Sequence, residues 1–319
     1  MIARYKKIPS LTFSFWKSYF ILMRPYLLFI SGITGLLGMA QAQAPFSLIF
    51  IILFLVFFFS YGAGQALTDC YQIDTDSLSS PYRPLVTGQL NKESVFFVSL
   101  SFLILANALL AVENYYNIFV ASLATIGLMT YTYFKRRFWG GPLYNGWIVA
   151  ALYVLGYQSF KPIAWQDEHI ILTLLTVLFA YAHFVLVGYF KDIEADRSTA
   201  YNTLPVVYGR KISCHISTFF AIAALSSTWL IINLEQSISS ISLLVFLISL
   251  IVYTVGQILL YQNKTDDTAY KPILFSVHAY IILMMSLILQ STPSWLIFMM
   301  SYYVFFVIAL KYRPCKTQI

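Results

Sequence analysis

Charged residues are scarce in this chain. Only 10% of its 319 residues are Asp, Glu, Lys or Arg, whereas 59% are hydrophobic. Because an ordinary soluble domain carries about 25% charged residues, the composition excludes that class and indicates a membrane protein. Acidic residues are the rarer of the two signs, with 13 against 20 basic residues. Any local concentration of them is therefore informative.

Cysteine is also rare. Cys70, Cys214 and Cys315 lie far apart in the sequence and form no CxxC or Cys/His ligand spacing. The sequence therefore indicates neither a disulfide framework nor a zinc site. The first residues lack a short apolar core followed by a small-residue cleavage site, so we expect no cleavable signal peptide.

Long apolar runs are abundant. Each is close to the roughly 20 residues that a helix needs to cross a bilayer. The runs are 19–40, 46–68, 93–112, 115–134, 142–160, 168–190, 213–234, 239–262, 270–290 and 293–312. We therefore predict an all-α fold, a polytopic membrane bundle of nine to ten transmembrane helices.

The basic residues are distributed unevenly between the loops. They precede the first run and follow every second run after it, whereas only Lys161 falls in the opposite set of loops. Lys and Arg beside membrane spans concentrate on the cytoplasmic side. We therefore expect both termini in the cytoplasm, with residues 1–18 as an N-terminal segment, 19–312 as one membrane domain and 313–319 as a tail. The net charge of +7 follows from this topology, and we expect no nucleic-acid partner.

Two stretches concentrate the acidic residues. They are TDCYQIDTDSLSSPYRPLVTG, from Thr68 to Gly88, and YFKDIEADRSTAYNTLPVVYG, from Tyr189 to Gly209. Each follows an apolar run on the predicted cytoplasmic side, and together they hold six of the 13 acidic residues. Loop charges that merely neutralise one another are the alternative interpretation, but such a concentration is unexpected for solubility alone.

Helical spacing predicts a pair of carboxylates in each stretch. If the second helix continues through residue 76, Asp69 and Asp76 share a face, because seven residues are close to two turns. Gln72 would lie between them. Asp192 and Asp196 are four residues apart and are also neighbours on a helix.

Such carboxylate pairs at one end of an apolar bundle predict a magnesium site that serves a diphosphate. Mg²⁺ takes a few of its six oxygen ligands from carboxylates and the rest from water and substrate phosphates. Bound cations would screen a diphosphate leaving group while an allylic C–O bond breaks. The predicted metal ligands are Asp69, Asp74, Asp76, Asp192 and Asp196. The basic residues expected to contact phosphate oxygens include Arg83, Lys135, Lys191 and Arg197.

With these residues, the chain resembles the UbiA-type superfamily of intramembrane prenyltransferases. That superfamily carries NDxxDxxxD at the end of its second helix, followed by an Arg-Pro pair and a glycine. The matching positions here are Thr68, Asp69, Gln72 and Asp76, then Arg83, Pro84 and Gly88. KDIEADR resembles the superfamily's second acidic motif and supplies Asp192, Asp196 and Arg197. Two weaker matches are Arg24 with Pro25, and KRRFWGGPLYNGW, which contains Lys135 and Asn145.

The chain departs from the superfamily pattern at two motif positions. Thr68 stands in place of the leading asparagine and Gln72 in place of the middle aspartate. The first motif therefore has one carboxylate fewer than the pattern. A tenth apolar run also exceeds the nine helices that are usual in the superfamily.

The resemblance implies an integral membrane enzyme that uses Mg²⁺ to ionise an isoprenyl diphosphate and transfers the prenyl group to a lipophilic acceptor, aromatic or quinone-like, in the lipid bilayer. It implies catalytic roles for Asp69, Asp76, Asp192 and Asp196. It implies substrate-binding roles for Arg24, Gln72, Arg83, Lys135, Asn145, Lys191 and Arg197. Two alternatives stay open: a membrane terpene cyclase that uses the same ionisation, and a non-catalytic lipid-binding or transport protein that kept the fold.

Overall fold

The computed structural model describes residues 12–137, 140–234 and 238–313. All regular secondary structure in these ranges is helical, which confirms the predicted all-α class. Residues 1–11 and 314–319 lie outside the described ranges, and so does most of the predicted N-terminal segment and tail. The division into segment, domain and tail stays a prediction.

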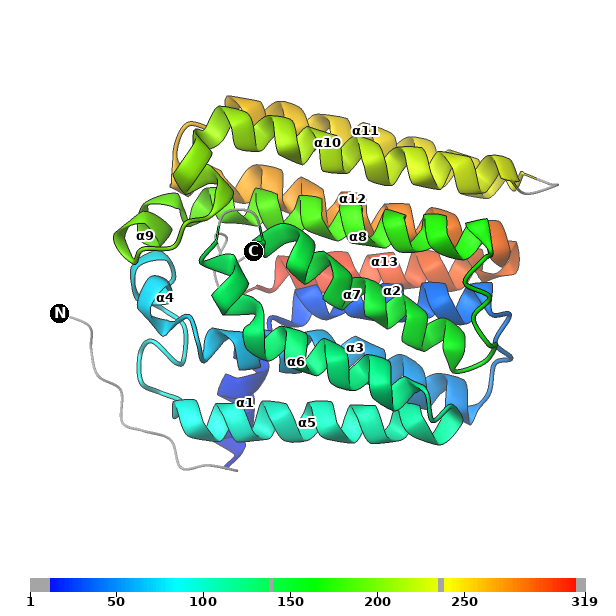
Figure 1. Ribbon diagram of the computed structural model, residues 1–319, viewed down its shortest axis with the longest axis horizontal. Helices are drawn as coiled ribbons and strands as arrows, with labels where there is room; N and C mark the ends of the chain where they lie inside the picture. Colours follow the sequence, from blue (N-terminus) through cyan, green and yellow to red (C-terminus); the bar gives the residue numbers. More distant parts are fainter. Residues whose placement is uncertain (1–11, 138–139, 235–237, 314–319) are drawn as a thin grey trace.

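Each of the ten apolar runs contains a long helix (Figure 1). These helices are α2 (Leu28–Gln41), α3 (Leu48–Asp69), α5 (Lys92–Glu113), α6 (Asn117–Lys135), α7 (Gly141–Gln158), α8 (Glu168–Gly188), α10 (Leu204–Leu234), α11 (Ser240–Gln262), α12 (Tyr270–Ser291) and α13 (Leu296–Lys311). Three shorter helices are α1 (Phe13–Leu22), α4 (Ile73–Ser79) and α9 (Ile193–Ser198). Short 3-10 turns are η1 (Pro25–Leu27), η2 (Tyr189–Lys191), η3 (Asp266–Thr268) and η4 (Pro293–Trp295).

By length and composition, eight helices in the described ranges could cross a membrane on their own. A ninth span arises if α1 and the segment Pro25–Gln41 are counted together. Helix α7, with 18 residues, is not one of these eight. It nevertheless packs alongside α2, α6 and α8 inside the bundle.

The first predicted run, 19–40, is not one straight helix. It bends by 52° between α1 and η1. Arg24 at the bend adopts a left-handed backbone conformation with φ 54° and ψ 73°. Pro25 explains the bend, because proline disfavours helical backbone in the residue before it and offers no N–H of its own. Arg24 and Pro25 therefore lie at a break between helices and not within the first helix.

The long helices begin at capping residues that are visible in the sequence. Ser47, Asn91, Asp167 and Ser239 precede α3, α5, α8 and α11, and each side chain accepts a hydrogen bond from a backbone N–H of the first turn. These bonds satisfy donors that a helix leaves unpaired at its start. The ends of these helices are therefore encoded locally.

The centre of the bundle is formed by α2, α7, α8 and α12. Helix α12 is the most enclosed of the candidate spans. In its most apolar stretch of 18 residues 83% is buried inside the protein, whereas the corresponding share is 22% in α5 and in α13. Helices α2 and α7 approach closely at two glycines, and a Cβ added to Gly156 would overlap the carbonyl oxygen of Gly35. Small residues commonly allow such backbone contact between helices in membranes.

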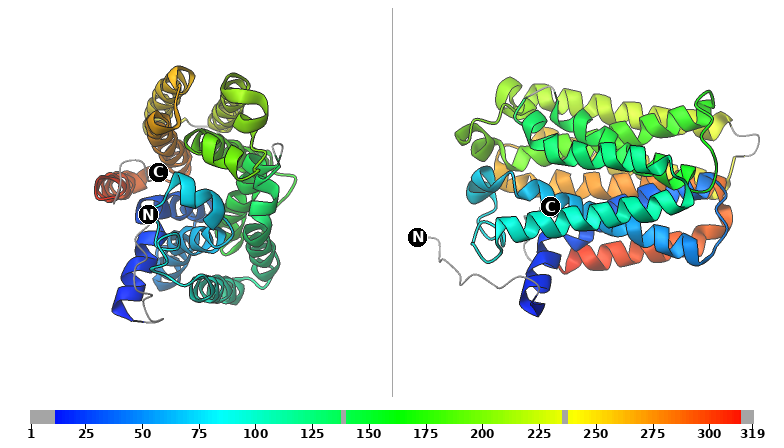
Figure 2. Two further views of the ribbon diagram at one scale, coloured as in Figure 1. Left: turned by 90° about the vertical axis from the view of Figure 1, so that its left-hand side faces the viewer. Right: turned by 60° about the horizontal axis from the view of Figure 1, so that its bottom comes forward.

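Both acidic motifs lie at the same end of the bundle, as their sequence positions predict. Helices α4 and α9, which follow α3 and α8, contact each other. Seen along the bundle, they cover the middle of that end (Figure 2). The loop between α7 and α8, residues 159–167, lies at the opposite end (Figure 1) and contains Lys161. The assignment of the motif-bearing end to the cytoplasm stays a prediction from the basic residues.

Candidate active site

Asp69 is the last residue of α3, and the helix does not continue to residue 76. The chain turns over residues 70–72, and α4 begins at Ile73. The shared helical face that the spacing predicted for Asp69 and Asp76 is therefore absent. Both carboxylates nevertheless face the Nη1 atom of Arg83, which lies 3.6 Å from Asp69 Oδ1 and forms an ion pair with Asp76 Oδ2.

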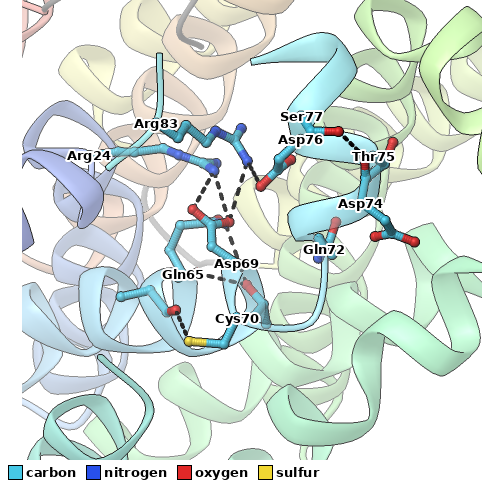
Figure 3. A network of polar contacts seen from close by, with 12 residues as sticks. Arg24, Gln65, Asp69, Cys70, Gln72, Asp74, Thr75, Asp76, Ser77 and Arg83 are labelled. Carbon is cyan, nitrogen blue, oxygen red and sulfur yellow. Dashed lines mark hydrogen bonds and ion pairs between the residues drawn. The ribbon is translucent and has the colours of Figure 1, made fainter. Parts of the chain in front are cut away.

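Asp69 is also bound by Arg24 (Figure 3). The Nη2 atom of Arg24 donates to both carboxylate oxygens of Asp69 at 3.0 Å. Gln65, one turn earlier on α3, donates to Asp69 Oδ1 at 2.7 Å. Asp69 is only 2% exposed, so two guanidinium groups and an amide replace the water that its charge has lost.

Arg83 lies between several carboxylates. Burial alone would lower the pKa of Arg83, but the carboxylates of Asp76, Asp69 and Asp192 outweigh burial and raise it. Burial also raises the pKa of Asp76, and Arg83 opposes that change. Arg83 thus pairs with Asp69 and Asp76 of the first motif, and the charge of Asp192, 116 residues after Asp76 in the sequence, also favours its charged form.

Lys135, the last residue of α6, lies between the two motifs. Its Nζ donates to Gln72 Oε1 at 3.0 Å and lies 3.6 Å from Asp196 Oδ1. Gln72, which replaces an aspartate of the superfamily pattern, therefore offers this ammonium a neutral oxygen. The rings of Tyr189 and Tyr201 lie 5.5 and 5.1 Å from the same Nζ, within the range of cation–π attraction.

The two aspartates of the second motif have different surroundings. Asp196 is fully buried, and its carboxylate accepts hydrogen bonds from Thr75 of α4 at 3.1 Å and from Thr203 at 3.2 Å. Burial raises the pKa of Asp196 to about 6, although Lys135 and the two hydroxyls oppose this. Asp192, in contrast, lines a cavity, and its buried Oδ1 atom accepts no hydrogen bond within the described part of the chain.

Two predicted site residues lie away from this cluster. Asp74 is exposed and pairs with Arg136 at 2.9 Å and with the hydroxyl of Tyr201 at 3.2 Å. Arg197 is exposed and pairs with Glu194 on its own helix. The structure brings neither residue into the cavity wall, because each points outward from α4 or α9.

A cavity of about 180 Å³ begins at the charged cluster and extends into the bundle. Its charged wall holds four cations and three carboxylates, namely Arg24, Arg83, Lys135, Lys191, Asp69, Asp76 and Asp192. Gln72 and Asn145 also line this part. The remaining wall is mainly apolar and includes Phe57, Leu110, Ala121, Leu152 and Leu155, from α3, α5, α6 and α7.

The depth of the cavity follows from its position along α6. Lys135 and Ala121 both line it and are 14 residues apart on that helix. At 1.5 Å per residue, the cavity spans roughly 21 Å along the bundle. One end therefore suits a multiply charged anion and the other a long hydrocarbon chain.

The acidic residues fit a divalent cation that binds together with an anionic ligand. Within the described ranges, no group of three or more His, Cys, Asp or Glu side chains could hold a metal ion unaided. Mg²⁺ usually needs only one or two carboxylates when phosphate oxygens complete its coordination. Asp192 supplies a buried oxygen that accepts no hydrogen bond within the described residues, and Asp76, which pairs with Arg83, lines the same cavity. The donor set therefore suits a magnesium ion that shares its ligands with a diphosphate.

Three residues of the site were not predicted from the sequence. Gln65 holds Asp69, whereas Thr75 and Thr203 hold Asp196. The first could have been found from its position one turn before Asp69 on the same helix. The sequence gives no comparable signal for the two threonines. Thr75 is 121 residues from Asp196, and Thr203 follows Asp196 only after α9 has ended.

Comparisons with known proteins agree with this geometry. The UbiA prenyltransferase family matches residues 28–276. Digeranylgeranylglyceryl phosphate synthase from Thermococcus kodakarensis is 24% identical over 262 residues, which cover 80% of this chain and 91% of the relative. The synthase of the same name from Thermococcus sibiricus is 28% identical over 223 residues, which cover 67% and 76%.

Solved structures share the fold. A UbiA homologue from Aeropyrum pernix K1 in its apo form superposes with a TM-score of 0.70 and 19% identity, over 82% of this chain and 97% of that one. A UbiA homologue from Archaeoglobus fulgidus bound to GPP and Mg²⁺ gives a TM-score of 0.64 and 18% identity, over 85% and 99%. Since the family match extends over most of the sequence, the chain belongs to the UbiA prenyltransferase family and is an integral membrane prenyltransferase.

Proposed function

We propose that this protein uses Mg²⁺ to ionise an isoprenyl diphosphate and transfers the prenyl group to a lipophilic acceptor within the bilayer. The observation that carries the proposal is the cavity, which is roughly 21 Å long and joins four buried or half-buried cations at one end to a mainly apolar wall. The homologue from Archaeoglobus fulgidus with GPP and Mg²⁺ supports the same donor class for this chain.

The charged end would hold the diphosphate. Arg83, Lys135 and Lys191 line it and could donate to phosphate oxygens by charge-assisted hydrogen bonds. Asp192 and Asp76 would hold magnesium, with Asp69 behind them in contact with Arg24 and Arg83. When bound, magnesium would neutralise negative charge on the diphosphate. Asp74 and Arg197 have no part in this set, because they lie outside the cavity.

The apolar end would hold the prenyl chain and exclude water from it. The allylic C–O bond breaks, the diphosphate leaves with the electron pair, and the acceptor forms the new bond while it loses a proton. The ring of Tyr189 lines the cavity beside Lys135, close to the point where charge and apolar wall meet. An aromatic face at that point would stabilise the allylic cation.

The acceptor that we propose is a glyceryl phosphate lipid. The support is the name shared by the relatives, which describes a glyceryl phosphate that carries geranylgeranyl chains. The new bond would then be a C–O ether bond to a glyceryl hydroxyl. An aromatic or quinone-like ring, the acceptor expected from the resemblance, is the alternative for the experiment to decide.

The test uses the full-length protein in lipid nanodiscs with labelled geranyl, farnesyl and geranylgeranyl diphosphates. Diphosphate release and extracted products are measured with a prenylated glyceryl phosphate, with a panel of aromatic acceptors, or with neither. We expect release that depends on the glyceryl phosphate and is abolished by a magnesium chelator. A product formed only with an aromatic ring would overturn the acceptor. Acceptor-independent terpene would support a cyclase, and no release from a folded protein would refute the enzyme.

A further inference from the structure

A polar pair lies deep in the apolar part of the cavity. Asn107 of α5 donates from Nδ2 to the hydroxyl of Thr125 on α6 at 3.3 Å, and Thr125 in turn donates to the carbonyl of Ala121 at 2.9 Å. Both Asn107 and Thr125 line the cavity. Helices α5 and α6 run side by side along the bundle (Figure 1).

The pair lies well beyond the charged end. Thr125 is ten residues before Lys135 on α6, which corresponds to about 15 Å along the helix. The cavity continues past the pair, because Leu110 and Ala121, each about one turn further, also line it. The neighbouring wall is apolar and includes Leu103, Ala106, Ala124, Leu128, Ile148 and Leu152.

Part of the Asn107 amide is left without a protein partner. One of its two N–H groups contacts Thr125, and within the residues that the structure describes no group donates to its carbonyl oxygen. The position is one of an inward stripe on α5, together with Leu103, Ala106 and Leu110. A polar group in such a place keeps a water molecule or loses its hydrogen bonds when hydrocarbon covers it.

We infer that Asn107, with Thr125, sets the length of the prenyl chain that the protein accepts. The inference rests on the proposed function, since it assumes that the prenyl chain occupies the apolar end. A chain that stops short of the pair leaves the amide hydrated. A longer chain must cover the amide and displace its water without replacing those hydrogen bonds. The penalty is polar and not steric, because space remains beyond the pair.

An interhelical hydrogen bond that merely joins α5 to α6 is the competing explanation. Such a bond would contribute to stability and have no effect on chain length. The two explanations differ in which measurement changes when Asn107 becomes apolar.

The experiment measures dissociation constants of non-hydrolysable thiolodiphosphates that carry geranyl, farnesyl, geranylgeranyl and geranylfarnesyl chains. The protein is full-length in nanodiscs with Mg²⁺, and isothermal titration calorimetry gives the constants. For the unchanged protein we expect affinity to rise with chain length and then to level off or fall. For Asn107→Leu we expect the affinity for the longest analogue to rise about tenfold relative to that for the geranyl analogue. The long chain then no longer has to strip water from the Asn107 amide.

A second variant relocates the polar group. Leu103 lies four residues before Asn107, about 6 Å nearer the charged end. The double variant Leu103→Asn/Asn107→Leu should move the break in affinity toward shorter chains. Thr125→Val serves as the control for the interhelical bond, because it removes the bond to Asn107 and keeps the amide in the cavity.

Each outcome decides the question. An unchanged ratio between long and short analogues in Asn107→Leu, with all of them bound, would overturn the inference and leave the proposed function intact. A lower unfolding temperature in Asn107→Leu and Thr125→Val alike, with that ratio constant, would assign the pair to helix packing. Absence of binding by any analogue to the unchanged protein would refute the proposed function, and the inference with it.

Discussion

Arg24 donates from one nitrogen to both carboxylate oxygens of Asp69, at 3.0 Å each, and it does so from a left-handed backbone conformation. The contact joins the break between α1 and α2 to the end of α3. Left-handed backbone is unfavourable for any residue with a Cβ. The ion pair and the bend at Pro25 therefore hold Arg24 in a conformation that its own backbone disfavours.

This conformation predicts a difference between two substitutions of Arg24. Both Arg24→Gly and Arg24→Ala remove the ion pair, which we expect to cost about 3 kcal/mol. Glycine tolerates the left-handed backbone, so Arg24→Gly should retain about 1 kcal/mol more stability than Arg24→Ala. Chemical unfolding in detergent micelles measures both variants. Equal stability of the two would show that the backbone of Arg24 is not strained.

Gln72 predicts a gain of metal affinity when the missing carboxylate is restored. Gln72→Asp places a negative charge beside Lys135 and the two motifs, so Mg²⁺ should bind about tenfold more tightly. Calorimetric titration of Mg²⁺ in the presence of inorganic diphosphate measures the change. Gln72→Asn is the matched neutral control and should not tighten binding. A gain in both variants would point to altered shape and not to charge.

The two aspartates of the second motif predict opposite phenotypes. Asp192→Asn removes the charge of a carboxylate whose Oδ1 accepts no hydrogen bond within the described residues, so it should weaken Mg²⁺ binding at least tenfold and cost less stability than Asp196→Asn. Asp196→Asn removes the only carboxylate that the structure pairs with Lys135 within the described residues and should cost about 3 kcal/mol of stability. Thermal unfolding and Mg²⁺ titration are measured on both proteins. If Asp192→Asn unfolds earlier while its metal binding is unchanged, the assignment is reversed.

Close contact between α2 and α7 predicts that Gly156 tolerates no side chain. In Gly156→Ala the new methyl group would meet the backbone oxygen of Gly35, so we expect a loss of about 2 kcal/mol. Gly188→Ala is the control, because nothing lies within 4 Å of an added Cβ there. Unfolding temperature in detergent reports both. Tolerance of Gly156→Ala would mean that the two helices can separate at little cost.

Much of the fold could be predicted from the sequence because lipid imposes strict requirements on it. A spanning segment must be long, apolar and internally hydrogen-bonded, so the ten apolar runs indicate helices directly. The bend at Arg24 does not follow from the apolar runs, because the run 19–40 is continuous through it. Only Pro25 indicates that the helix is interrupted there. The kink at Gly209, where φ is 76°, lies outside every apolar run, so the pattern of runs does not indicate it.

The candidate site was predictable in its residue types and less so in its geometry. Asp69, Asp76, Asp192 and Lys135 lie at one end of the bundle, as expected from the two motifs. Helical spacing could not place Asp74, because α3 ends at Asp69 and α4 starts in a new direction. The role of Thr75 depends on Asp196, which lies 121 residues further along the chain. Contacts of this kind follow from tertiary packing and leave no periodic signal.

The carboxylate of Asp69 occupies two arginines that a phosphate would also seek. Asp69 does not use either guanidinium fully, since Arg24 contacts it through one nitrogen and the Nε atom of Arg83 has no hydrogen-bond partner within the described residues. The diphosphate of the proposed function would meet donors on both arginines while Asp69 still holds them. The Asp69 carboxylate thus orients both side chains in the ligand-free structure, and no rearrangement of the two arginines is needed before an anion arrives.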